Sequence, residues 1–219
     1  MLGQERSKIM RILIVDNRPV IQYGFRRMLE DKFLGSTFGD ASHSQQALDL
    51  VGQGAWDLVL INMLLPGRGG LEVLKQIRIE HPKLPVIVYS AHSEKQYAVR
   101  AFKTGASGSV PMESTPEQLA EAIRKVIGGG KYVSPGLAEH LATALDQDLR
   151  QAPHDLLSDR EYQVLCMIAA GKATTAIADQ LSLSVKTVST YRTRILEKLQ
   201  LKTVSELVRY AVDNNLDLY

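Results

Sequence analysis

Residues 11 to 128 alternate short apolar runs with amphipathic segments, and this alternation constrains the fold more than any other feature of the sequence. The runs at 11–15, 57–61 and 85–89 are rich in β-branched residues and nearly continuous, as in parallel strands buried on both faces. Weaker runs at 37–41 and 107–110 predict two further strands. Helices are predicted between them at 19–32, 44–53, 70–80, 94–103 and 116–128. The pattern predicts an α/β domain with a doubly wound, five-stranded parallel sheet.

Residues 156 to 219 follow a different pattern, with no strand signal and four helical segments at 159–170, 174–181, 185–199 and 203–214. The glycines at 128–130 should end the last helix of the α/β domain, and Ser134-Pro135 should begin a linker helix over 135–150. We therefore expect an α/β domain at 10–128, a linker with a helix at 129–155, and an all-α domain of four helices at 156–219.

Composition narrows the functions open to these two domains. The formal net charge of +2 gives no general basic field, so any nucleic-acid site must be a local patch. The single Cys166 excludes an internal disulfide, and the five histidines lack metal-ligand spacing, so no metal is expected. No apolar stretch reaches about 18 residues and the N-terminus is polar, which predicts a cytoplasmic protein with no membrane partner.

The all-α segment carries the signals of a helix-turn-helix. Ser158 and Glu161 form a capping box at the start of its first helix, and Gly171 closes that helix. A short helix at 174–181 and a turn are then followed by a longer helix that Ser184 caps. Such a pair of helices can insert the second one into the DNA major groove.

The longer helix has one apolar and one polar face. The apolar face contains Val188, Ile195 and Leu199. The outward, polar face contains Lys186, Ser189, Thr190, Thr193 and Arg194. Residues 184 to 202 contain five basic side chains and one acidic side chain, a local charge of +4. Short hydroxyl side chains can approach base edges while lysine and arginine reach phosphates. On periodicity alone, a solvated helix of a four-helix bundle is equally compatible with this pattern.

Several motifs make residues 157 to 199 resemble the LuxR-type DNA-binding domain. They are Leu157 to Glu161, Val164-Leu165, Gly171, Ile177 to Leu181, Leu183 to Val188 and Ile195 to Leu199. The resemblance implies that 184–198 is a recognition helix. Base contacts are then expected from Ser189, Thr190 and Thr193, and phosphate contacts from Lys186, Arg192 and Arg194. Lys198, a basic residue at the end of the same helix, is expected to bind DNA of any sequence. It also implies a dimerisation helix at 203–214, in which Val204, Leu207, Val208 and Ala211 partly face a second copy.

The α/β segment has polar residues where its strands end. Asp16 and Asn17 follow the first strand, Asn62 the third and Ser90 the fourth, and Met112 lies just beyond the fifth. In an open parallel sheet these carboxyl ends meet at one edge, where ligands bind. With Pro66-Gly67 and the glycines of 105–108, the layout resembles the flavodoxin-like receiver domain of response regulators. The two domains together resemble the NarL/FixJ subfamily.

Four positions depart from what this resemblance implies. A receiver of that family has a second acidic residue where this chain has Asn17, and a phosphoacceptor aspartate where it has Asn62. Met112 stands in place of a lysine, and Ser109 in place of the switch aromatic. A neutral amide cannot form an acyl phosphate, and the one remaining carboxylate, Asp16, should bind Mg²⁺ weakly or not at all.

We therefore expect a DNA-binding transcriptional regulator of the two-component type that binds double-stranded operator DNA as a homodimer, without conventional aspartyl phosphorylation. No enzymatic activity and no cofactor are expected. Two alternatives stay open: a conventional phospho-switched regulator with a substituted acceptor, or a module that pairs with other regulators. A sensor kinase is a further candidate partner. A flavodoxin-like enzyme is disfavoured, because no GxGxxG follows the first strand and no GxxxxGK[ST] occurs.

Overall fold

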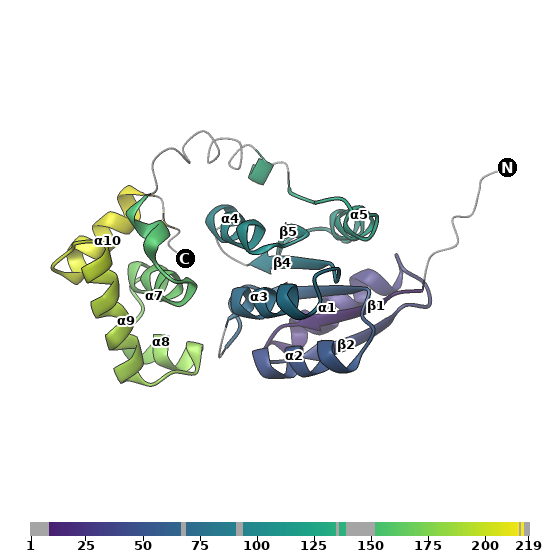
Figure 1. The fold of residues 1–219 in the computed structure, drawn as a ribbon, viewed down its shortest axis with the longest axis horizontal. Coiled ribbons are helices and arrows are strands. Elements are labelled where there is room, and N and C mark those ends of the chain that lie inside the picture. Colours follow the sequence, from purple (N-terminus) through teal and green to yellow (C-terminus); the bar gives the residue numbers. More distant parts are fainter. Residues whose placement is uncertain are drawn as a thin grey trace.

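The chain folds into an α/β unit followed by an all-helical unit, as seen in a computed structural model (Figure 1). The structure describes residues 9–66, 69–90, 94–134, 136–138, 152–214 and 216. The linker helix predicted at 135–150 lies largely outside these residues. Five parallel strands form one sheet in the order β2-β1-β3-β4-β5, which confirms the predicted doubly wound sheet.

The elements of the α/β unit alternate along the chain as the sequence predicts. The strands are β1 (Arg11–Val15), β2 (Thr37–Ala41), β3 (Leu58–Asn62), β4 (Val86–Ser90) and β5 (Gly108–Pro111). The helices are α1 (Pro19–Glu30), α2 (Ser44–Gln53), α3 (Gly70–Glu80), α4 (Glu94–Thr104) and α5 (Pro116–Ile127). Their ends lie within two residues of the predicted ones.

Successive residues of the central strands face two different cores, because side chains alternate across a sheet. Ile12 and Ile14 of β1 are buried in a cluster with Phe25 of α1 and the apolar face of α5. Leu13 and Val15 are buried in the cluster that contains the apolar faces of α2, α3 and α4. The sheet is therefore covered by helices on both faces, which explains why its strands are apolar throughout.

The helical unit begins with the 3₁₀ turn η1 (Pro153–Leu156), followed by α7 (Asp159–Ala169), α8 (Thr174–Leu181), α9 (Val185–Lys198) and α10 (Val204–Asp213). Both predicted caps are confirmed. The Ser158 hydroxyl accepts from the Glu161 N–H at 3.3 Å, while the Glu161 carboxylate accepts from the Ser158 N–H at 2.7 Å. Ser184 Oγ accepts from the Thr187 N–H at 3.0 Å, so α9 starts where the sequence predicts.

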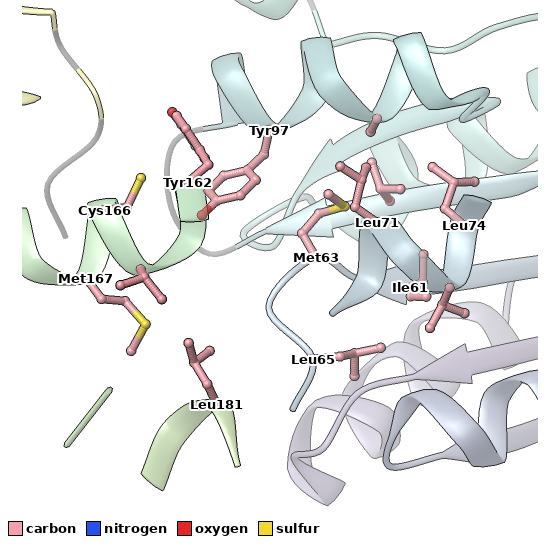
Figure 2. Packing of buried hydrophobic residues seen from close by; sticks show 14 of the residues in the cluster. Ile61, Met63, Leu65, Leu71, Leu74, Tyr97, Tyr162, Cys166, Met167 and Leu181 are labelled. Atoms are coloured by element: carbon pink, nitrogen blue, oxygen red, sulfur yellow. The ribbon is translucent and has the colours of Figure 1, made fainter. Parts of the chain in front are cut away.

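The two units pack against each other through α4 and α7. The rings of Tyr97 on α4 and Tyr162 on α7 meet edge to face, with centroids 5.3 Å apart (Figure 2). Met63 and Leu65, in the turn after β3, belong to the same buried cluster as the core of the helical unit. One apolar cluster therefore continues from the sheet into the helical unit.

Arg100 of α4 is the main polar link between the units, and its side chain is only 14% exposed. Its guanidinium donates to the carbonyl oxygens of His154 at 2.8 Å and Leu157 at 3.0 Å, and to the Asp159 carboxylate at 3.2 Å. It also lies 4.2 Å from the centroid of the Tyr162 ring, a cation–π distance. Arg100 thus holds the start of α7 against the α/β unit.

Candidate functional sites

The carboxylate of Asp16, at the carboxyl end of β1, is fully buried and accepts five hydrogen bonds. Oδ1 accepts from the Arg18 backbone N–H at 2.8 Å and from Arg18 Nε at 3.0 Å. Oδ2 accepts from Arg18 Nη2 at 2.8 Å, Asn62 Nδ2 at 3.0 Å and the Tyr89 hydroxyl at 2.8 Å. A buried carboxylate needs such partners, and this network supplies donors to both of its oxygens.

Arg18 is the principal partner of Asp16, a contact that the sequence does not predict. The hydrogen bond with Asp16 raises the pKa of the guanidinium above its ordinary value, against the effect of partial burial. The same Nη2 lies 3.2 Å from the sulfur of Met112. In a receiver of the family that this chain resembles, the carboxylate at this position would bind a metal. Here Arg18 places a positive charge beside that carboxylate instead.

Asn62, at the end of β3, uses both ends of its amide and is 4% exposed. Its Nδ2 donates to Asp16, and its Oδ1 accepts from the Leu64 N–H at 2.9 Å. Gly70 approaches the same point: a Cβ built on it would lie 2.2 Å from the Asn62 carbonyl oxygen, so only glycine fits. Asn62 thus joins the buried network to the turn that contacts the helical unit.

Tyr89 of β4 is a second partner of Asp16 that the sequence analysis missed. Burial raises the pKa of its phenol, and the nearby charge of Asp16 adds to that effect. The hydroxyl therefore stays protonated and donates to the carboxylate. Its ring meets Phe25 edge to face at 4.7 Å, which fixes it between the sheet and α1.

The other residues predicted at this edge of the sheet differ in burial. Ser90 and Ser109 are buried, Met112 is half-buried, and Asn17 is exposed. The backbone N–H of Met112 donates to the Ser90 carbonyl at 3.2 Å, which joins the ends of β4 and β5. These residues do not fit a divalent metal, because the one buried carboxylate already has both oxygens bonded by protein donors. Among the described residues, no three His, Cys, Asp or Glu side chains gather as a metal-binding group.

The two faces predicted for the long helix of the C-terminal unit are present on α9. Val188 and Ile195 are buried, whereas the polar side is open to solvent. Of the predicted DNA contacts, Lys186, Thr190, Thr193 and Arg194 are exposed, and Ser189 and Arg192 are half-buried. In Figure 1, α9 lies on the side of the helical unit away from the sheet, with α7 between them. The outward face of α9 is therefore free to meet a partner.

Lys198, the last predicted DNA contact, forms an ion pair within the chain. Its ammonium lies 2.6 Å from the carboxylate of Glu161 and 3.3 Å from the Leu156 carbonyl oxygen. Burial acts to raise the pKa of Glu161, but hydrogen bonds from Lys198 and Ser158 together lower it below its ordinary value. The contact joins the end of α9 to the start of α7, which favours a structural role for Lys198.

The predicted dimerisation residues of α10 divide into two groups. Leu207 and Ala211 are 0% exposed and pack within the helical unit, so they are not available to a second copy without unfolding. Val204 is 40% exposed and Val208 is half-buried. Val212, which was not predicted, is 49% exposed on the same helix.

The described helices include none long and apolar enough to cross a bilayer.

Two protein families match this chain, one for each unit. The family described as the response regulator receiver domain matches residues 12–124. The family described as bacterial regulatory proteins, luxR family, matches residues 155–211. Both matches agree with the resemblances seen in the sequence motifs.

Similar proteins extend over nearly the whole chain. The response regulator GacA of Pseudomonas viridiflava is 34% identical over 209 residues, which cover 95% of this chain and 98% of GacA. The response regulator UvrY of Escherichia coli K12 is 32% identical, with 95% and 96% covered. A LuxR-family response regulator from Aurantimonas has a TM-score of 0.59 at 30% identity, covering 63% of this chain and 98% of that one. RcsB of Salmonella typhimurium shares the fold, with a TM-score of 0.58 at 22% identity over 94% of this chain and 99% of RcsB.

Proposed function

The chain belongs to the response regulators that join a receiver domain to a LuxR-type DNA-binding domain, and we propose that it binds operators without conventional phosphorylation of its receiver. The observation that carries this proposal is the buried network in which Arg18 and Asn62 both bond the Asp16 carboxylate. We further propose that the protein works in the cytoplasm and has no enzymatic activity, in line with its regulatory relatives.

Two chemical requirements of aspartyl phosphorylation are missing at this network. The nucleophile must be a carboxylate, and Asn62 offers a neutral amide whose two ends are already hydrogen bonded. The phosphoryl group also needs cationic stabilisation from a metal or a lysine. Arg18 is the nearby cation here, and its Nε and Nη2 are taken up by Asp16. The polar groups of this network are therefore already hydrogen bonded to one another, and none of them is suited to accept a phosphoryl group.

The receiver is proposed to act instead as a docking module for the DNA-binding unit. Arg100 and Tyr97 of α4 hold α7 from the side opposite to the outward face of α9. These contacts involve α7 and the residues just before it, and they leave Lys186 and Arg194 exposed. In this arrangement the receiver carries the recognition helix without covering its polar face.

We assign α9 to the major groove, with Lys186, Arg192 and Arg194 on phosphates and Ser189, Thr190 and Thr193 facing bases. One such helix covers only half of a site, so two copies about one helical turn apart are expected on a roughly palindromic operator. Val204 and Val208, with the exposed Val212, are the proposed contacts between the two copies.

The test measures operator affinity before and after treatment with acetyl phosphate and Mg²⁺. An operator is first selected from a random DNA library, and its Kd is then measured by fluorescence anisotropy at fixed salt, because phosphate contacts weaken as salt rises. We expect the same Kd, within about twofold, with and without phosphodonor. A receiver that has the phosphoacceptor aspartate and the lysine of the family is treated in parallel, to show that the phosphodonor is active.

Three outcomes would support a different function. A rise in affinity of tenfold or more after treatment, with a phosphoryl group located by mass spectrometry, would establish a phospho-switched regulator with another acceptor. Failure to select any DNA would favour a module that pairs with other regulators. Binding to DNA with no sequence preference, abolished by salt, would contradict a specific operator.

A further inference from the structure

The two exposed threonines of α9 already donate their hydroxyl protons to the backbone of the helix. Thr190 Oγ1 donates to the Lys186 carbonyl at 3.0 Å, and Thr193 Oγ1 donates to the Ser189 carbonyl at 3.2 Å. A hydroxyl has a single proton to donate. Each of these side chains therefore offers a partner its methyl group and a hydroxyl oxygen that can only accept.

Thr187, one turn earlier, is employed differently. Its hydroxyl lies 2.8 Å from the Ser184 hydroxyl, and the same Ser184 oxygen caps the helix by accepting from the Thr187 N–H. Thr187 is half-buried in this cap, so it belongs to the start of the helix. Thr190 and Thr193, three residues apart, share one exposed side of α9.

The major groove presents one apolar group, the C5-methyl of thymine, beside its hydrogen-bond donors and acceptors. A threonine whose proton is spent on the helix matches that methyl better than it matches an acceptor such as guanine O6. We propose that Thr190 and Thr193 read thymine methyl groups with their own methyl groups, and thereby set the sequence preference of the operator. This inference rests on the proposed insertion of α9 into the major groove.

The test removes the two methyl groups separately, one from the DNA and one from the protein. Each thymine of the selected operator is replaced in turn by deoxyuridine, which lacks the methyl but keeps the base pair. We expect one or two of these replacements to weaken binding by about fourfold each, the effect of losing one buried methyl-sized group. Replacement of thymines outside the site serves as the DNA control.

Protein variants then separate the methyl group from the hydroxyl. Thr193→Val keeps a methyl group and loses the hydroxyl, so it should stay sensitive to deoxyuridine. Thr193→Ser keeps the hydroxyl and loses the methyl, so its Kd should be the same on thymine and deoxyuridine at the affected position. The same pair of variants at Thr190 gives an independent measurement, and Thr175→Ser, on an exposed residue of α8, is the matched control.

The possible results are distinct. Sensitivity to deoxyuridine that persists in both serine variants would overturn the inference, as would an operator whose affinity no deoxyuridine changes. Loss of sequence preference in the valine variants, with retention in the serine variants, would show that the hydroxyls do the reading. Absence of DNA binding by the unaltered chain would instead contradict the proposed function itself.

Discussion

The buried network of Asp16, Arg18, Asn62 and Tyr89, called the Asp16 pocket below, and the outward face of α9 use charged side chains in opposite ways. In the pocket, a buried carboxylate is bonded by Arg18, Asn62 and Tyr89, so its charge is satisfied within the chain. On α9, Lys186 and Arg194 are exposed, and their charge is available to a phosphate. The difference teaches that a charge satisfied internally contributes to stability, whereas an exposed one contributes to binding.

The largest effect is expected from removing the cation of the pocket. Arg18→Met leaves the Asp16 carboxylate buried without its main partner, which should lower the free energy of unfolding by about 3 kcal/mol. This figure is at the low end for a buried pair, because the Arg18 side chain is 39% exposed. Urea unfolding of the two proteins measures it.

A matched control lies on the same helix. Arg27 pairs with Glu30 at the exposed surface of α1, where solvent screens the pair, so Arg27→Met should leave stability nearly unchanged. Asp16→Asn introduced together with Arg18→Met should recover part of the lost stability, because no uncompensated charge then remains. Equal effects of Arg18→Met and Arg27→Met would contradict the structural role of the pocket.

An intermediate effect is expected at the contact between the units. Arg100→Ala removes hydrogen bonds to two carbonyls and one carboxylate, so docking should weaken by about 2 kcal/mol, or about thirtyfold in the ratio of docked to undocked chains. Small-angle X-ray scattering should show a larger radius of gyration. Arg209→Ala, at an arginine 84% exposed on α10, should leave the scattering unchanged. An unaltered radius for Arg100→Ala would mean that the apolar contacts alone hold the units.

The smallest effect separates two lysines of α9. Lys198→Ala should cost about 1 kcal/mol of stability through its partner Glu161, since Lys198 is 39% exposed, and should change the salt dependence of binding little. Lys186→Ala should leave stability unchanged, weaken binding to all sequences about equally, and lower the salt slope by about one. Weaker DNA binding without loss of stability in Lys198→Ala would return that lysine to the DNA interface.

Acid pH sharpens the same comparison. The pKa of Glu161 is lower in the folded protein than its ordinary value of 4.5, so its ion pair stabilises the fold above that pH. As the pH falls below 4.5 and through the lowered pKa, Glu161 takes up a proton and this stabilisation is lost. The stability difference between the unaltered chain and Lys198→Ala should therefore narrow in acid.

The parts of the fold that depend on near neighbours could be predicted from the sequence. The capping box of Ser158 and Glu161 spans three residues, and the apolar runs of β1 and β3 define their strands without reference to the rest of the chain. The substitutions at positions 62 and 112 could likewise be recognised, because the resemblance aligns them with known positions of a receiver.

The contacts that decide what each charge does could not be predicted in the same way. The Arg18 side chain reaches back two residues, but Asn62 and Tyr89 reach Asp16 from two other strands, β3 and β4. Lys198 contacts Glu161, which lies 37 positions away in the sequence. The basic composition of α9 cannot show this contact, and it led to the prediction that Lys198 binds DNA. The resemblance also gave Leu207 and Val204 the same predicted role in dimerisation, whereas their burial depends on how α10 lies against α7.

Arg100 grips mainly the peptide backbone of the DNA-binding unit, because two of its three oxygen acceptors are the carbonyls of His154 and Leu157. Carbonyl groups are present whatever the side chain, so positions 154 and 157 can diverge over evolution without removing those acceptors. The receiver thereby recognises the backbone before α7 more than the side chains there. A contact of this kind lets the DNA-binding unit change its targets while its attachment to the receiver stays constant.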